Sequence, residues 1–378
     1  MKDLKNDIKS IGKQLGFDEV GIAGVDKFKT DQLAAKDRVR NGLIDGLSWF
    51  TEDRVMLANT PEELLPGCKS IISVAISYYK DKDAETYADG KLRGKVARYA
   101  WGMDYHDVIK KRLKSFVTDI ENHIGREFRW RIFVDDGAMN DRAAAERAGI
   151  GWFGKNSNIL TASHGSWVFL GQIITDLAII PDRPNLKTCG DCELCITKCP
   201  TGAIEAPYTI NNDLCISFLT IELKGVIPRN LRPLVGDWVF GCDICQDVCP
   251  VNSNVLKSQE KYFNKRNDFD ALELLPLLSL NEEEFRNKFK NSPIKRTKLE
   301  GLKRNVCVAL GNLKDKRAVV ALLGLVYDKS FVVRIHAVWA LGCIGIDEGT
   351  RAHLLEALDS EKHPEVANEM QDVLNKSS

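Results

Sequence analysis

The chain has 378 residues, which suggests two or three domains at about 100–200 residues each. Its 53 Lys and Arg residues balance its 53 Asp and Glu residues, so the net charge gives no argument for binding nucleic acid or a membrane. Hydrophobic residues make up 44% and charged residues 28%, values that exclude a disordered chain, a collagen and a coiled coil as the global organisation.

The N-terminal segment is charged throughout and lacks the apolar core of a signal peptide. The longest apolar runs, at 71–76 and 177–181, are too short to span a bilayer. We therefore expect a cytoplasmic protein with no membrane partner and with reduced cysteines. Eleven cysteines are present, and eight of them lie between Cys189 and Cys249. Such clustering indicates metal or redox chemistry.

Residues 1–184 predict a mixed α/β domain. We expect helices over 3–15, 105–123 and 142–148, and strands over 20–25, 69–79, 130–134 and 167–180, the last of these forming one or two strands. The helices carry apolar residues on one face, and the strands are rich in β-branched and aromatic residues. The Pro and Asn residues at 181–185 indicate a domain boundary.

The cysteine-rich segment, placed at 185–258, is followed by a helical pattern over 259–378. Its first two helices are expected over 268–277 and 281–290. RNVCVALGNL at 304–313 then aligns with RIHAVWALGC at 334–343, which is typical of a short HEAT-like stack. Plain helical packing without a repeat is the alternative. The expected fold class is therefore α+β, with an α/β domain, a ferredoxin-like domain and a HEAT-like helical region.

The first cysteine run spells C-x2-C-x2-C-x3-C-P, in which three close cysteines bind one [4Fe–4S] cluster and the fourth binds another. A shorter C-x2-C-x3-C-P run follows, and Cys215 is the nearby cysteine that completes the set. One cluster is therefore expected on Cys189, Cys192, Cys195 and Cys249, and the other on Cys199, Cys215, Cys242 and Cys245. Zinc is the alternative, although zinc ribbons do not normally use three cysteines at successive x2 spacings.

Other cysteines and motifs carry less information. Cys68, Cys307 and Cys343 lie in apolar contexts and are expected to be buried structural thiols. A G-x-G-x-x-G match at 149–154 follows a predicted helix instead of a strand, which argues against a dinucleotide site. Asp135 ends a predicted strand before a turn and a helix, so it is a candidate acid, or simply a helix cap.

Basic residues crowd one stretch of the helical region, opposed there by Glu300 alone. They are Arg286, Lys288, Lys290, Lys295, Arg296, Lys298, Lys303 and Arg304, and Arg229 and Arg232 could extend them. A protein that holds RNA needs such a patch against the phosphates. A solvated helical face is the alternative.

Several segments together resemble epoxyqueuosine reductases, over nearly the whole chain. They are VARYAWGMDYH (96–106), VDDGAMNDRAAAERAGIGWFGKN (134–156), HGSWVFLG (164–171), CISFLTIELKGVIP (215–228), FGCDICQDVCPVN (240–252) and both cysteine runs. That family is similar in its cofactor core to reductive dehalogenases. The resemblance implies a cobalamin without a histidine ligand, two [4Fe–4S] clusters and an external one-electron donor.

The resemblance also implies the reaction, which is the last step of queuosine synthesis. Cob(I)alamin would remove the epoxide oxygen of epoxyqueuosine at the wobble position of tRNA, with electrons relayed through the clusters. By the same resemblance Asp135 is the proton donor, and the corrinoid-contacting residues are Arg98, Tyr105, Asp135, Lys155, Asn156 and Ser157. The expected tRNA contacts are Arg229, Lys295, Arg296, Lys298 and Arg304, in a protein expected to be monomeric.

Two other functions fit parts of the pattern. A small-molecule reductase of the reductive dehalogenase type would use the same cofactors, but the basic stretch and the helical repeat argue against it. A non-enzymatic electron-transfer protein on a helical scaffold would bind the clusters and no corrinoid. Retention of cobalamin distinguishes this last hypothesis from the other two.

Overall fold

The structure, a computed structural model, describes residues 2–81 and 89–376. The chain forms two compact units, each assembled from three stretches of sequence. Unit 1 comprises Met1–Asp81, Gly102–Asp213 and Asp243–Asn264, and unit 2 comprises Lys82–Trp101, Leu214–Cys242 and Lys265–Ser378. Helices and strands occur in both units, which agrees with the predicted α+β class. The predicted three-domain division stays a prediction.

Unit 1 is built on a four-stranded antiparallel sheet. In spatial order its strands are β1 (Glu19–Ala23), β2 (Ser70–Ser77), β7 (Val168–Thr175) and β4 (Trp130–Phe133). The two long strands lie in the centre, and every residue of β2 is buried. All four strands were predicted, and the 167–180 segment forms one strand of this sheet.

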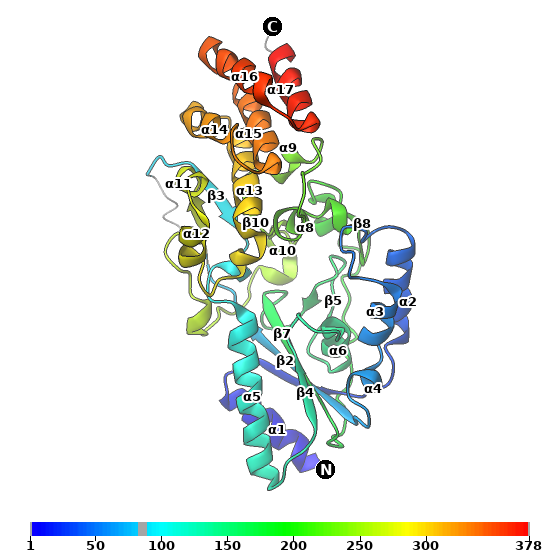
Figure 1. Cartoon of the computed structure of the whole chain (residues 1–378). Coiled ribbons are helices and arrows are strands. Elements are labelled where there is room, and N and C mark those ends of the chain that lie inside the picture. The colour runs from blue at the N-terminus through cyan, green and yellow to red at the C-terminus, as the bar shows by residue number, and fades with distance from the viewer. Residues whose placement is uncertain (1, 82–88, 377–378) are drawn as a thin grey trace. The chain divides into compact units, whose positions relative to one another are not determined.

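Helices cover both faces of this sheet (Figure 1). α1 (Lys2–Gln14) and α5 (Tyr105–Ile124) pack on one face, and α6 (Asp141–Arg147) packs on the other. Gly171 in β7 permits the approach of α5, because a Cβ there would lie 3.2 Å from a Leu113 methyl group. The three alanines of α6 are buried, so this short helix lies close against the sheet.

Short elements complete unit 1. They are α2 (Lys29–Arg40), α3 (Glu52–Ala58), α4 (Pro61–Leu64), the β5–β6 hairpin (Trp152–Phe153 and Ile159–Leu160), α7 (Leu194–Thr197), the β8–β9 hairpin (Ile204–Ala206 and Thr209–Ile210), α10 (Ile244–Asp247) and the 3-10 turns η3 (Pro250–Asn252) and η4 (Lys261–Phe263). α7 and α10 each carry cysteines and pack against one another.

Unit 2 combines a small sheet with a helical stack. Its strands are β10 (Trp238–Phe240), β3 (Arg93–Val96) and β11 (Ala271–Glu273), in that order. Its helices are η1 (Arg98–Ala100), α8 (Ile216–Ile221), α9 (Arg232–Val235), α11 (Leu275–Leu278), α12 (Glu282–Lys288), η5 (Pro293–Thr297), α13 (Lys298–Leu313), η6 (Lys316–Ala318), α14 (Val319–Leu325), α15 (Phe331–Ile344), α16 (Glu348–Ser360) and α17 (Pro364–Lys376). α15 packs on both α13 and α17, which agrees with the predicted stack.

The prediction of one helix over 268–277 is wrong. Ala271–Glu273 forms strand β11, which pairs with β3, and only the short helix α11 follows it. The apolar spacing of this segment fits both a helix and a strand, and pairing with a distant strand decided between them.

Within residues 2–81 and 89–376, no helix is both long and apolar enough to cross a membrane.

Candidate functional site

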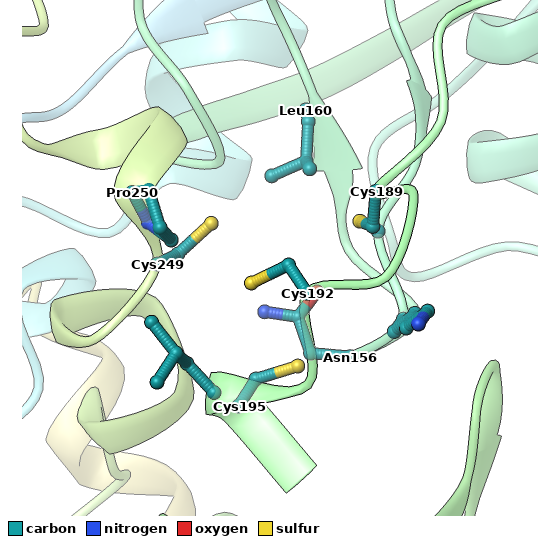
Figure 2. Close-up of a pocket in the computed structure, with 10 residues that line it drawn as sticks. Asn156, Leu160, Cys189, Cys192, Cys195, Cys249 and Pro250 are labelled. Atoms are coloured by element: carbon teal, nitrogen blue, oxygen red, sulfur yellow. The ribbon is translucent and has the colours of Figure 1, made fainter.

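Four cysteines of unit 1 surround one cavity (Figure 2). They are Cys189, Cys192, Cys195 and Cys249, the set that the spacing predicts for one cluster. The rest of the lining consists of Gly154, Lys155, Asn156, Leu160, Leu194 and Pro250. The fold therefore brings the last cysteine of the second run to the first three of the first run.

Tight turns of the chain set the positions of these thiols. The N–H of Cys192 donates to the carbonyl of Cys189 at 3.1 Å, around Gly190, whose φ of 50° suits a residue without a Cβ. Cys195 lies on the one-turn helix α7. Cys249 directly precedes Pro250, which has no N–H to continue a helix, so the chain leaves α10 at this point.

The four thiols affect one another's ionisation. Burial raises the pKa of Cys195, and the neighbouring Cys189 and Cys249 raise it further. Burial also raises the pKa of Cys249, with Cys189 and Cys192 acting in the same direction. Four thiolates in this cavity therefore need positive charge beside them, and coordinated metal ions supply it.

The sulfurs surround a shared space (Figure 2). Among the residues that the structure describes, no three His, Cys, Asp or Glu side chains are grouped so as to hold a single metal ion. A [4Fe–4S] cluster spreads its cysteine ligands over different irons. A cavity lined by four thiols fits such a cluster.

The other four cysteines divide between the two units. Cys199 and Cys245 belong to unit 1, where they follow α7 and lie on α10 respectively. Cys215, at the N-terminus of α8, and Cys242, just after β10, belong to unit 2. All four are partly buried. Their assignment to one cluster stays a prediction.

Asp135 lies on the loop after β4. Its φ of 53° is in the left-handed region, which aspartate enters more readily than most residues. Its Oδ2 accepts a 2.6 Å hydrogen bond from the hydroxyl of Tyr105, the first residue of α5. The Tyr105 ring in turn stacks on His106 and Phe169. Two of the predicted site residues are therefore in contact, and an aromatic cluster fixes the hydroxyl that orients the carboxylate.

One expectation about this loop needs correction. Asn140, and not Asp135, caps α6, since its side chain accepts from the N–H of Ala143. Asp135 and Asp136 both follow the end of β4. Asp136 pairs with Lys110, so both carboxylates find partners on α5.

The predicted corrinoid loop of residues 155–157 lies beside the cysteine cavity. Asn156 is buried, and its amide donates to the carbonyl of Cys245 at 3.3 Å. Ser157 is also buried, with a φ of 61°, and donates to the carbonyl of Tyr208. Lys155 lines the cavity, with Nζ 3.9 Å from Glu193. Arg98, in unit 2, is buried with its guanidinium over the ring of Trp101.

The basic residues of unit 2 differ in their surroundings. Lys295 and Arg296 on η5 and Lys298, the first residue of α13, are exposed. Arg296 pairs with Glu222 at 2.7 Å. Arg229 is part-exposed and pairs with Glu369 and Asp372.

Arg304, in contrast, is 1% exposed. Its guanidinium donates to the carbonyls of Leu219, Leu223 and Gly225. These bonds hold α13 against the α8 segment, so the structure gives Arg304 a packing role where we expected a phosphate contact. Burial lowers its pKa to about 10.

The isolated cysteines lie outside these sites. Cys68 and Cys307 are buried, as predicted, whereas Cys343 is only partly buried. Burial, with Glu62 adding to it, raises the pKa of Cys68 to about 11. These thiols are poor nucleophiles and ligands at neutral pH.

Sequence reasoning missed two polar residues near Asp135. Asp141 is the first residue of α6, and Gln172 lies within the apolar strand β7. Gln172 is fully buried, and its amide donates to the carbonyl of Asp141 at 2.9 Å. The available signal was the presence of a glutamine inside a run of apolar strand residues, since a buried polar side chain costs free energy unless it has a role or a partner.

Three family models match successive parts of the chain. Residues 59–136 match epoxyqueuosine reductase QueG, residues 188–252 match a 4Fe-4S double cluster binding domain, and residues 298–375 match HEAT repeats. The second match supports two [4Fe–4S] clusters on the cysteine pattern described above. The third confirms the predicted repeat.

Individual proteins match over most of the chain. An epoxyqueuosine reductase of Xanthomonas campestris is 37% identical, covering 90% of this chain and 96% of that protein. A solved epoxyqueuosine reductase with an epoxyqueuosine-modified tRNA-Tyr stem loop has a TM-score of 0.93 and 34% identity, covering 100% of this chain and 99% of that one.

A third match is another solved epoxyqueuosine reductase. The epoxyqueuosine reductase of Bacillus subtilis, solved with an aspartate catalytic loop swung out of the active site, has a TM-score of 0.92 and 34% identity, covering 99% of each chain. Likeness of this extent in sequence and in fold, together with the three models, identifies the relationship: the chain belongs to the epoxyqueuosine reductase family, whose members are oxidoreductases.

Proposed function

We propose that this protein reduces epoxyqueuosine in tRNA to queuosine, the last step of queuosine synthesis. The observation that carries the proposal is the match, over the full chain, to an epoxyqueuosine reductase solved with an epoxyqueuosine-modified stem loop. The cysteine cavity and the Tyr105–Asp135 pair supply the electron-transfer and proton-transfer groups that the reaction needs.

The reaction has a fixed stoichiometry. Converting an epoxide to an alkene breaks both C–O bonds, forms the C=C bond and releases the oxygen as water. It therefore consumes two electrons and two protons. The electrons come from an external one-electron donor and pass through the two clusters. We assign the proton that reaches the epoxide oxygen to the carboxyl group of Asp135.

Cobalamin is part of the proposal. When bound, it supplies a strongly reducing and nucleophilic cobalt centre for the cleavage of the C–O bond. Its rim carries amide groups, which need ammonium, hydroxyl and carboxylate partners. Unit 1 supplies groups of these kinds: the Lys155 ammonium and the Tyr105 hydroxyl as donors, and the Asp135 carboxylate as an acceptor, so the residues present fit the cofactor. Asn156 and Ser157 are buried and bond to protein carbonyls, so we give them the role of shaping the loop.

One experiment tests the function directly. Anaerobic incubation of the reconstituted protein with cobalamin, a one-electron reductant and epoxyqueuosine-containing tRNA should convert the nucleoside to queuosine, measured by mass spectrometry. Unchanged epoxyqueuosine with fully loaded protein would reject the proposal. A protein that binds clusters but no cobalamin would support the electron-transfer alternative.

The tRNA surface is expected at the exposed turn of Lys295, Arg296 and Lys298. Replacing all three with glutamate should weaken tRNA binding and lower the slope of log affinity against log salt by roughly 2–3 units, since each lost phosphate contact contributes about 0.7–0.9. Binding is measured by filter retention across a salt series. The pair of Arg296 with Glu222 is exposed, so its loss should cost at most about 1 kcal/mol of stability.

A matched triple variant controls for net charge. Lys314, Lys316 and Arg317 are also exposed, in the same unit and near one another in sequence. Changing these three to glutamate alters the net charge equally, but we expect the salt slope to stay as in the unmodified protein. Equal weakening in both triple variants would move the RNA site elsewhere.

A further inference from the structure

A row of four residues crosses the sheet of unit 1 beneath α6. Gly21 in β1 faces Ser73 in β2, Ser73 faces Gln172 in β7, and Gln172 faces Phe133 in β4. Directly opposed residues of antiparallel strands point to the same face, with their Cβ atoms about 5 Å apart. Phe133 is buried against α6, so Ser73 and Gln172 also point to the α6 side.

This face holds polar atoms without partners. Ser73 and Gln172 are both 0% exposed. Within residues 2–81 and 89–376, Ser73 Oγ, Gln172 Oε1 and Asp141 Oδ1 are buried and have no hydrogen-bond partner. Leaving such atoms unpaired costs free energy, and a site with several of them is where a protein holds a buried water.

The structure places Asp141 between this row and the Asp135 loop. The amide of Gln172 donates to the Asp141 carbonyl at 2.9 Å. Asn140 caps α6 and also donates to Asn59 at 2.9 Å, which fixes the start of the helix. Asp141 is partly exposed as a residue, but its Oδ1 is buried and directed into the protein.

The charges around Asp141 favour its protonated form. Burial raises its pKa well above the usual range, and the carboxylates of Asp135 and Asp136 add to this. Arg142 and the backbone N–H of Asp135 act in the opposite direction. From α5, Tyr105 bonds to Asp135 and Lys110 pairs with Asp136, so neither is directed at Asp141.

The stoichiometry of the proposed reaction leaves one proton unassigned. Release of the epoxide oxygen as water takes two protons, and the carboxyl group of Asp135 delivers one at a time. A second proton has to reach Asp135 within the same turnover. Besides the Tyr105 hydroxyl, which contacts Asp135 directly, a protonated carboxylic acid six positions along the chain is an internal source.

We propose that Asp141 is a positioning residue that holds this second proton and passes it to Asp135 through a water bound by Ser73, Gln172 and Asp141. After Asp135 has given its own proton to the oxygen, Asp141 loses its proton, and Asp135 gains that proton and delivers it to the oxygen as the second one. Solvent restores the protons of both carboxyl groups once the product leaves. The electrons come from the external donor as before. This inference rests on the proposed function.

Asp141→Asn keeps the size and the hydrogen bonds of the side chain but removes its proton. We expect turnover of the fully loaded enzyme to fall by about 10²-fold, the lower end of the effect of a lost proton donor. Acetic acid added at millimolar concentration should partly restore the rate, because it brings a proton that a purely structural role would not need. Ser73→Ala, which removes one ligand of the water, should slow turnover by about 3- to 10-fold, the effect of one hydrogen bond.

Asp136→Asn is the matched control, since it removes a neighbouring carboxylate that pairs with Lys110 at the surface. We expect it to retain the unmodified rate and to show no response to acetic acid. An Asp141→Asn enzyme with the unmodified rate would overturn the inference while the proposed function stands. Absence of queuosine formation by the unmodified protein would instead reject the proposed function.

Stability provides a readout that does not depend on turnover. The folded chain keeps the Asp141 proton at a pH where the unfolded chain has released it, so stability should fall as the pH rises from about 4 toward the raised pKa. Asp141→Asn has no proton to lose, so its unfolding free energy, measured with urea, should fall less over the same range. Identical pH dependence in the two proteins would contradict a protonated Asp141.

Discussion

Replacement of Asp135 by asparagine is expected to slow queuosine formation by about 10²–10⁴-fold, the usual effect of removing a positioned general acid. The variant keeps the size of the side chain, and its amide oxygen can still accept the hydrogen bond from Tyr105. The loop should therefore keep its shape, and the iron content and cobalamin retention should be unchanged. Single-turnover assays with loaded enzyme and nucleoside mass spectrometry measure the rate.

Two neighbouring variants make this prediction specific. Asp136→Asn should remain active, because Asp136 pairs with Lys110. Tyr105→Phe removes the hydroxyl that orients Asp135 and should produce a smaller loss than Asp135→Asn. A fully active Asp135→Asn enzyme would reject the role of this carboxyl group. An active Asp135→Asn with an inactive Asp136→Asn would transfer the role to the neighbour.

The cysteine cavity was the part of the site most accessible from the sequence. Three of its four thiols lie within seven residues, so their spacing alone constrains the geometry of the loop. The fourth, Cys249, was predictable because the second run repeats the Cys-Pro ending of the first. The ligands of such a cluster lie close together in sequence, so their spacing alone predicts most of the ligand set.

The surroundings of Asp135 and Arg304 could not be predicted from the sequence in this way. The hydroxyl of Tyr105 reaches Asp135 only because α5 packs on the sheet that ends at this loop. Arg304 belongs to a basic run in the sequence, yet its guanidinium bonds to backbone carbonyls about 80 residues away. A charge pattern cannot distinguish an arginine that satisfies buried carbonyls from one that faces solvent.

The misassigned segment at 268–277 shows a third limit. Its leucines are spaced as a helix requires, but β3 offers an edge with which Ala271–Glu273 pairs. Tertiary pairing overrode local preference there, as it commonly does for short segments. The long helices α5, α13 and α15 were predicted more reliably. Apolar residues repeat at helical spacing over several turns there, and a strand does not produce that pattern.

Cys192→Ser is expected to remove the cluster of the cysteine cavity and to abolish queuosine formation. A serine hydroxyl stays protonated near neutral pH, so the [4Fe–4S] cluster would lose one of its four thiolate ligands. The neighbouring thiols Cys189, Cys195 and Cys249 cannot compensate, because each already occupies its own position around the cavity. Iron and sulfide should fall to about half, since the second cluster uses other cysteines.

Cys343→Ser is the matched control, because it makes the same chemical change at a partly buried thiol outside the cysteine runs. It should keep the full iron content, the broad charge-transfer absorbance and the activity. We attribute the loss of activity in Cys192→Ser to interrupted electron flow to the cobalamin. Stoichiometric reduced cobalamin should therefore permit one turnover in this variant. The affinity for tRNA should be unchanged. Unchanged iron content in Cys192→Ser would contradict the cluster assignment. So would one zinc ion per cysteine cavity in the unmodified protein after anaerobic purification. Either result would leave the reaction without its proposed electron path.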